Sequence, residues 1–167
     1  MILIGIGANL PTVRYGPPRA GCEAALAELG ACGVRVIRRS RWYESAPVPL
    51  SDQPWFVNGV AAVETARAPR ALLEALQAVE VRFGRVRAEA NGPRVIDLDL
   101  LAYDDRVIEE QGLSVPHPRL ASRAFVLLPM REVAPFWRDP RSGRSLDELI
   151  ADLPAGQVVR PLGEEPA

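Results

Sequence analysis

The sequence contains no lysine, so all 20 of its lysine-plus-arginine positions are arginines. A P-loop nucleotide site requires the lysine of its Gly-Lys-Ser/Thr motif, and Schiff-base catalysis requires a lysine amine. Both classes of site are therefore excluded. A protein of this composition that binds phosphate groups must neutralise their charge with arginine and with metal ions.

Cysteine and histidine are scarce too. Cys22 and Cys32 are the only cysteines, they lack a Cys-x-x-Cys spacing, and His117 is the single histidine. This set of ligands is too small for a structural zinc site. We therefore expect both cysteines to be buried free thiols.

A large charge excess and a long apolar run are also missing. The net charge of -1 lacks the basic excess that a nucleic-acid-binding protein normally shows. No apolar run reaches the roughly 20 residues that span a bilayer, and the first residues, MILIGIGANL, lack the charged start of a signal peptide. We expect a cytoplasmic protein that binds neither nucleic acid nor membranes, and we expect it to be a monomer.

The hydrophobic content of 48% and the length of 167 residues are typical of one globular domain with a proper core. Apolar periodicity and Gly/Pro positions predict strands and helices in the order β-α-β-β-α-β. This order indicates an α+β fold, an antiparallel sheet with helices on one face. The predicted strands are 1–7, 34–43, 56–64 and 95–103, the predicted helices are 22–29 and 69–83, and two further helices are expected at 123–132 and 145–153.

The last of these strands carries two carboxylates, Asp97 and Asp99, two residues apart. Side chains of a strand alternate between faces, so both carboxylates project to the same side. Neighbouring like charges repel, and strands disfavour aspartate, so the pair needs compensation. A Mg²⁺ ion would supply it, since Mg²⁺ binds carboxylates together with substrate phosphates. The residues alone equally allow a half-exposed strand with aspartates on its wet face and arginine partners.

Two loops have compositions that favour function over simple connection. The loop 84–94 contains Gly84, Gly92 and Pro93, has no apolar periodicity, and carries three arginines. One guanidinium group can bind two phosphate oxygens at once, so these arginines suit a phosphorylated ligand. The loop 44–54 contains three prolines and is long for a connection.

Five segments match known motifs in order from Ile4 to Pro135: IGANL, YESAPV, DQPWFVN, GRVRAEANGPRVIDLDLLAYDDRVI and LSVPHPRLASRAFVLLPMREVAP. Together they resemble the 6-hydroxymethyl-7,8-dihydropterin pyrophosphokinase family of folate biosynthesis. The resemblance implies transfer of diphosphate from ATP to the pterin hydroxymethyl group, with AMP as the second product. It also implies two Mg²⁺ ions and a ferredoxin-like fold with extra C-terminal helices. We accordingly expect residues 1–162 to form one catalytic domain and residues 163–167 a flexible tail.

The resemblance gives a role to each position that matches a family motif. Asp97 and Asp99 would bind the metal ions, and Arg85 and Arg94 would join them as catalytic residues. The ATP-binding positions would be Gln77, Glu80, Arg85, Arg87, Arg94, Leu100, Ser114, His117 and Arg123. The pterin-binding positions would be Gly7, Asn9, Ser45, Pro47, Val48, Phe56, Asn58, Asp97 and Phe125, with the two phenylalanines on either side of the ring.

Most of these residues also have an ordinary structural explanation. The two phenylalanines would equally suit core packing, and His117 would equally suit a structural role. Asn9 and Ser45 are typical turn residues. Gln77 and Glu80 would otherwise form an exposed flank of their helix.

The sequence departs from the family pattern in the cationic loop. The segment 84–92 is one residue shorter than usual, and Ala90 and Asn91 stand where an Arg-Trp pair is common. Pro118 replaces an aromatic residue, and Pro49 replaces a glycine. The shortened loop motivates an alternative, a non-catalytic ferredoxin-like module that binds nucleotide or pterin. A third possibility is another Asp-x-Asp transferase with a nucleotide donor.

Overall fold

A six-stranded antiparallel sheet forms the centre of the computed structural model, which describes residues 1–84 and 93–163. The strands run in the order β5-β1-β4-β3-β8, and β2 pairs with the far end of β4. The βαββαβ part of the prediction and its α+β class are confirmed. The strands of this sheet are β1 (Ile2–Ala8), β2 (Arg35–Arg39), β3 (Tyr43–Ser45), β4 (Phe56–Glu64), β5 (Asp97–Tyr103) and β8 (Val159–Pro161).

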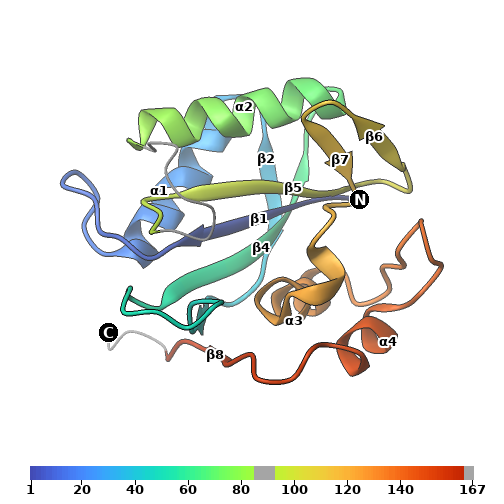
Figure 1. Cartoon of the computed structure of the whole chain (residues 1–167). Coiled ribbons are helices and arrows are strands. Elements are labelled where there is room, and N and C mark those ends of the chain that lie inside the picture. The colour runs from blue at the N-terminus through green and yellow to red at the C-terminus, as the bar shows by residue number, and fades with distance from the viewer. Residues whose placement is uncertain (85–92, 164–167) are drawn as a thin grey trace.

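Helices cover both faces of the sheet (Figure 1). The two helices of the βαββαβ unit lie on one face, as predicted, and the extra C-terminal helices take the other. A small hairpin stands beside the end of β5. These elements are α1 (Pro18–Ala31), α2 (Pro69–Arg82), the hairpin β6 (Ile108–Glu110) and β7 (Leu113–Val115), the 3-10 turn η1 (Leu120–Ser122), α3 (Ala124–Val133) and α4 (Leu146–Ala151).

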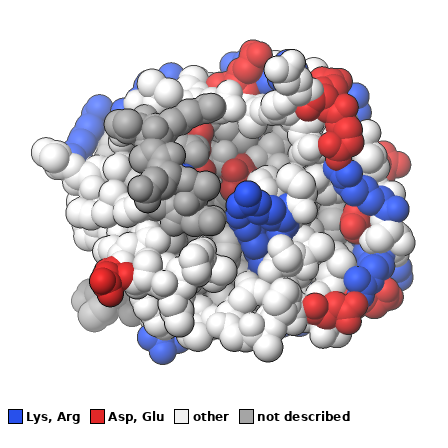
Figure 2. Space-filling model, viewed as in Figure 1, with Lys and Arg blue, Asp and Glu red and all other residues white. Residues whose placement is uncertain are grey.

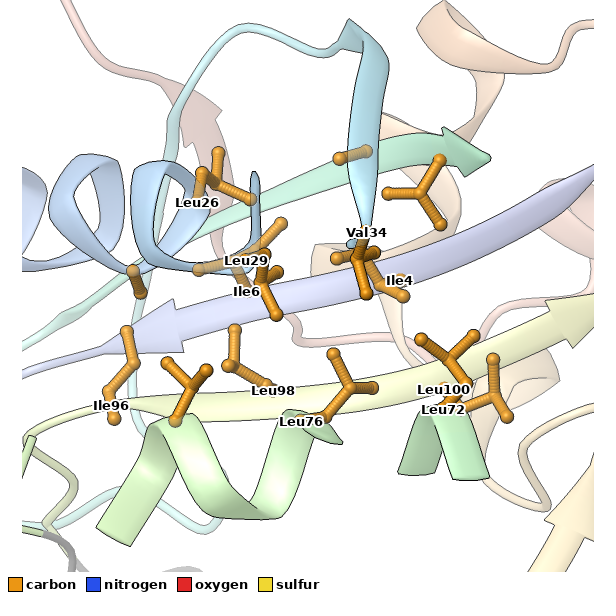
Figure 3. Close-up of a cluster of buried hydrophobic side chains, with 14 of the residues drawn as sticks. Ile4, Ile6, Leu26, Leu29, Val34, Leu72, Leu76, Ile96, Leu98 and Leu100 are labelled. Carbon is orange, nitrogen blue, oxygen red and sulfur yellow. The ribbon is translucent and has the colours of Figure 1, made fainter. Parts of the chain in front are cut away.

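The main core lies between the sheet and the helices α1 and α2. Side chains of β1, β5 and both helices point toward one another there (Figure 3). Ile96, Leu98 and Leu100 all belong to this core, so the alternate residues of β5 face the opposite way. The helical stripe predicted in α2 is buried and consists of Leu72, Leu76, Val79 and Phe83.

A second core lies under α3 and α4. Leu3 of β1, Val60 of β4 and Leu101 of β5 pack there against Leu127 and Met130 of α3. Both faces of β1, β4 and β5 are therefore covered over part of their length. The remaining part of this second face is open to solvent, and the candidate site lies there.

The strand predicted at 34–43 is divided in two, so that prediction was wrong in its extent. Ser40 is buried between β2 and β3, where its hydroxyl accepts a bond from the N–H of Val60 (3.0 Å) and donates to the carbonyl of Arg41 (2.7 Å). Trp42 then packs against Gly59, where a Cβ atom would lie 2.7 Å from its ring. The break in the strand at residues 40–42 lets β2 and β3 pair with different parts of β4.

Other boundaries also differ from the sequence prediction. The first helix begins at Pro18 instead of residue 22, because a proline suits the first turn of a helix. The hairpin β6-β7 and the strand β8 were not predicted. Cys22 is buried as expected, whereas Cys32 is only half-buried. Ser145 caps α4 as predicted, because its hydroxyl accepts a bond from the N–H of Glu148 (3.2 Å).

Of the predicted tail at 163–167, residue 163 belongs to the described residues and 164–167 lie outside them. Within the described ranges, none of the helices combines the length and the apolar character that crossing a bilayer requires.

Candidate active site

A cavity of about 850 Å³ opens on the face of the sheet that carries α3. Its floor comes from β1, β4 and β5, and its walls come from three segments that are distant in sequence: 45–50, 117–126 and 154–158. A volume of this order accommodates a small organic ligand. Basic and acidic side chains meet in a hollow near the centre of the face drawn in Figure 2.

Asp97 and Asp99 both lie on the cavity floor, as the strand alternation predicts. Asp97 pairs with Gly7 of β1, and Asp99 pairs with Gly5. The neighbouring strand therefore places no side chain beside either carboxylate, and the space above them stays open. Of the described residues, no group of three or more His, Cys, Asp or Glu side chains is arranged to hold a metal. A cation on the two carboxylates would need oxygen ligands from water or from a substrate, which is the coordination that Mg²⁺ prefers.

Arginines face the carboxylates across the cavity. Arg94, Arg119 and Arg123 all line it. Burial lowers the pKa of Arg123, and the nearby negative charge of Asp99 opposes that effect. The Arg123 guanidinium carbon also lies 5.3 Å from the ring centre of Phe125, which is cation–π geometry. The cavity thus offers positive charge beside its acidic floor.

His117 enters the cavity as an uncharged side chain. Burial, helped by the positive charges of Arg123 and Arg119, lowers its pKa to about 4, although the negative charge of Asp97 opposes this shift. Its Nδ1 accepts a bond from the N–H of Arg119 (3.1 Å), so the proton of the neutral ring lies on Nε2. The His117 N–H donates to the carbonyl of Leu101 (2.9 Å), which fixes the residue to β5. His117 is therefore a hydrogen-bond donor at neutral pH, in a fixed position.

The cavity is also lined by aromatic and amide side chains. Phe56 at the start of β4 and Phe125 in the first turn of α3 both line it, and both are half-buried. Asn58 is buried and donates through Nδ2 to the hydroxyl of Ser45 (2.6 Å). A Cβ atom at Gly7 would lie 2.9 Å from the Asn58 amide oxygen, so only glycine leaves room for this side chain. Pro47 and Val48 complete this part of the wall.

Asn9 lies outside the cavity lining, although the family pattern places it near the pterin. It is 1% exposed, and its Nδ2 donates to the side chain of Gln53 and to the carbonyl of Pro54, both at 2.9 Å. Its Oδ1 accepts from the N–H of Arg94 (2.8 Å). Asn9 therefore joins the backbone of Arg94 to the loop that precedes β4.

Glu80 also lies outside the cavity lining, and its interpretation as part of an exposed helix flank is wrong. Its side chain is buried, and its Oε2 accepts a bond from the N–H of Leu98 (2.9 Å). Gln77, one turn earlier on α2, is half-buried and is likewise outside the lining.

Two more predicted ATP positions do not line the cavity. The Leu100 side chain belongs to the main core, on the opposite face of β5. Ser114 lies in the hairpin, where its hydroxyl donates to Glu109 (2.7 Å). Arg85 and Arg87 lie outside the described residues, so their predicted roles stay predictions.

Several residues that shape the site were missed because no motif marks them. Arg141 donates through Nη2 to the carbonyls of Val115 and Pro116, both at 3.1 Å, and also pairs with Glu109. It thereby holds the backbone just before His117. The segment 154–158 forms a wall of the cavity and carries no recognisable motif.

Comparison with known proteins agrees with this geometry. A family model described as 7,8-dihydro-6-hydroxymethylpterin-pyrophosphokinase matches residues 3–135. The 2-amino-4-hydroxy-6-hydroxymethyldihydropteridine pyrophosphokinase of Pseudomonas aeruginosa is 42% identical over 160 residues, which are 95% of each protein. The protein of the same name from Synechocystis sp. is 42% identical over 90% of this chain and 75% of its own length. That of Methylorubrum extorquens is 40% identical over 94% of this chain and 96% of its own length. The chain therefore belongs to the 7,8-dihydro-6-hydroxymethylpterin-pyrophosphokinase family.

Proposed function

We propose that this chain transfers diphosphate from ATP to the hydroxymethyl group of 6-hydroxymethyl-7,8-dihydropterin, as a step of tetrahydrofolate biosynthesis. The pterin hydroxyl oxygen forms a bond to the β-phosphorus of ATP, and the hydroxyl proton is released. The bond from the β-phosphorus to the oxygen that bridges to the α-phosphorus breaks, and AMP leaves. The products are AMP and the pterin diphosphate.

One observation carries the proposal beyond family membership. A single cavity brings together a carboxylate pair, arginines, two aromatic side chains and a buried amide. Phosphoryl-type transfer needs positioning and charge neutralisation more than covalent chemistry. The proposed reaction needs these two kinds of surface next to each other.

At the phosphate end, we propose that Arg94 and Arg123 bind the triphosphate and that His117 donates a hydrogen bond from Nε2. Arg85 and Arg87 would add further positive charge. Asp97 and Asp99 suit two Mg²⁺ ions shared with phosphate oxygens, and such ions would neutralise negative charge on the transferred group. The open space above the carboxylates, opposite Gly5 and Gly7, is consistent with this arrangement.

At the pterin end, we propose that Phe56 and Phe125 contact the two faces of the ring. Flat heterocycles stack well on aromatic side chains. The Asn58 amide, held by Ser45, offers both a donor and an acceptor to the ring edge. We also propose that residues 1–162 act as one catalytic unit, and that the protein works as a cytoplasmic monomer.

An assay of AMP release from ATP and Mg²⁺ tests this function, with and without the pterin alcohol. We expect AMP only when the pterin alcohol is present, and we expect a metal chelator to stop its release. Pterin-independent AMP release, or none at all with every component present, would contradict the proposal.

The two alternatives make different predictions in the same assay. A non-catalytic binding module would bind ATP or pterin in calorimetry without releasing AMP. Its motivation was the shortened loop, and the likeness to proteins named as pyrophosphokinases over nearly their whole length does not favour it. A different Asp-x-Asp transferase would depend on both aspartates yet ignore the pterin.

A further inference from the structure

The segment 154–158 lies beyond residues 3–135, the part that the family model matches, yet it forms a wall of the cavity. It follows α4 and leads into β8. Two neighbouring residues of this segment, Gln157 and Val158, make hydrogen bonds to two different cavity walls.

The first connection joins the segment to the wall that holds Ser45 and Val48. The carbonyl of Val158 accepts a bond from the N–H of Ala46 (3.0 Å). The strand β8 then continues the pairing, with Val159 opposite Ser45. The segment is therefore an extension of the sheet at this wall.

The second connection joins the segment to the start of α3, and Gln157 makes it. The side-chain Oε1 accepts from the N–H of Ala124 (2.9 Å), and Nε2 donates to the carbonyl of Ser122 (2.9 Å). Only one orientation of the amide satisfies both bonds. The N-cap residue of α3, Arg123, makes no side-chain capping bond of its own. Gln157 thus supplies from a distance the acceptor that a helix N-terminus needs.

These connections bear on the two aromatic residues of the cavity. Ala124 lies between Arg123 and Phe125 in the sequence. Gln157 therefore makes hydrogen bonds to the backbone of the residues directly before and directly after Arg123. Phe56 pairs with Ser45 across β3 and β4. Gln157 and Val158 therefore link the wall that carries Phe125 to the wall beside Phe56.

We propose that Gln157 is a positioning residue that sets the spacing between the Phe125 wall and the Ser45 wall, and so tunes the site for a flat heterocycle. The inference rests on the proposed function for the identity of that heterocycle. It makes the C-terminal segment a determinant of pterin affinity more than of ATP affinity. The reason is that its two connections reach residues proposed to contact the pterin, Phe125 through α3 and Ser45 through β3, whereas they reach the proposed ATP site through the backbone beside Arg123.

Two substitutions separate the bonds of Gln157. Gln157→Leu keeps the approximate shape and removes both bonds, together with the 3.4 Å bond from Nε2 to the carbonyl of Pro154 within the same segment. Gln157→Glu keeps the acceptor for Ala124 but turns the donor to Ser122 into a second acceptor, so it should be less damaging to the helix start. Gln111→Leu is a matched control, because Gln111 lies exposed in the turn between β6 and β7, away from the cavity.

Steady-state kinetics give the main test. We expect Gln157→Leu to raise the KM for the pterin about tenfold, because it removes the hydrogen bonds that hold the wall carrying Phe125. We expect its KM for ATP to rise too, but by a smaller factor than the KM for the pterin, through the backbone on either side of Arg123. We expect Gln157→Glu to lie between wild type and Gln157→Leu. The control should match wild type. Equal increases in both KM values, or no change in the pterin KM, would overturn the proposal.

Amide hydrogen exchange provides a measurement that does not depend on turnover. Loss of the Gln157 acceptor should speed exchange of the Ala124 N–H in Gln157→Leu and leave it slow in Gln157→Glu. Unchanged exchange in Gln157→Leu would overturn the connection itself. A wild-type protein that released no AMP would instead refute the proposed function, while the exchange result would still decide whether Gln157 holds α3.

Discussion

The Glu80 carboxylate of α2 accepts a 2.9 Å hydrogen bond from the backbone N–H of Leu98, the residue between Asp97 and Asp99. A buried carboxylate of the neighbouring helix thus fixes the strand between the two groups proposed to bind metal. Glu80 itself is not among the residues that line the cavity, whereas both aspartates are.

Removing this bond should disturb the carboxylate pair without touching the cavity. We expect Glu80→Ala to cost about 1–3 kcal/mol of unfolding free energy, because it leaves a buried N–H unpaired. We also expect AMP release to slow and the Mg²⁺ requirement to rise. Denaturant titrations and a Mg²⁺ series would measure both. Glu80→Gln retains an acceptor and should lie closer to wild type, so equal effects of the two variants would contradict this explanation.

Substitution of either cavity aspartate should abolish most of the activity. We expect Asp97→Ala and Asp99→Ala each to lower AMP release by roughly 10²-fold or more, as loss of a major electrostatic contribution does. Asp105→Ala, in the exposed turn after β5, is the matched control. Near-normal AMP release by either cavity variant would refute the metal assignment.

Asn9 should matter through the loops that it joins. Asn9→Ala removes the acceptor for the Arg94 N–H and the donors to Gln53 and Pro54. We expect a loss of about 1–3 kcal/mol in unfolding free energy and a higher KM for ATP, since Arg94 loses its fixed backbone. Asn9→Asp keeps the acceptor and should retain more of the ATP affinity. A stability loss with unchanged kinetics would limit Asn9 to a folding role.

The lowered pKa of His117 predicts how the unfolding free energy depends on pH. Burial lowers its pKa to about 4 in the folded protein, below the ordinary value of 6.5. Between these values the unfolded chain binds the proton first, so the unfolding free energy should fall as the pH decreases from about 6.5 to about 4. Its titration is easy to follow by NMR, because the sequence has only one histidine. A titration midpoint near 6.5 in the folded protein would contradict the prediction.

The two cysteines should react at very different rates. Burial raises the pKa of the Cys22 thiol to about 12, so it should resist alkylation at pH 8 in the folded protein. Cys32 is half-buried, with Arg82 Nη2 at 3.0 Å from its sulfur, and should react first. Mass spectrometry of the Cys22→Ser and Cys32→Ser variants would assign the labelled site. Rapid labelling of Cys22 without unfolding would show that α1 opens.

Local patterns predicted the elements around the site well. The alternation in β5 placed Asp97 and Asp99 on one face, and the helical stripe from Leu72 to Phe83 placed α2 against the core. Both predictions depend on residues that are close in sequence, where side-chain periodicity follows directly from backbone geometry.

Long-range pairing explains what the sequence did not reveal. The strand β8 has three residues and pairs with β3, more than 100 positions earlier, so no local pattern marks it. Gln157 acts on α3 from an exposed segment, and its composition is that of an ordinary loop. The burial of Glu80 was not predicted for a related reason, because a glutamate on a helix is usually exposed unless a partner is present. Its partner is a backbone N–H, which every strand residue has.

The strand β5 serves two purposes at once, with leucines toward α2 and carboxylates toward the cavity. Its side chains repeat every two residues, so a shift of one residue in its register against β1 would exchange the two faces. Leucines would then line the phosphate end, and the aspartates would face the hydrocarbon interior. Natural variation in chain length is therefore tolerable before this strand only where the pairing of Asp97 with Gly7 is kept.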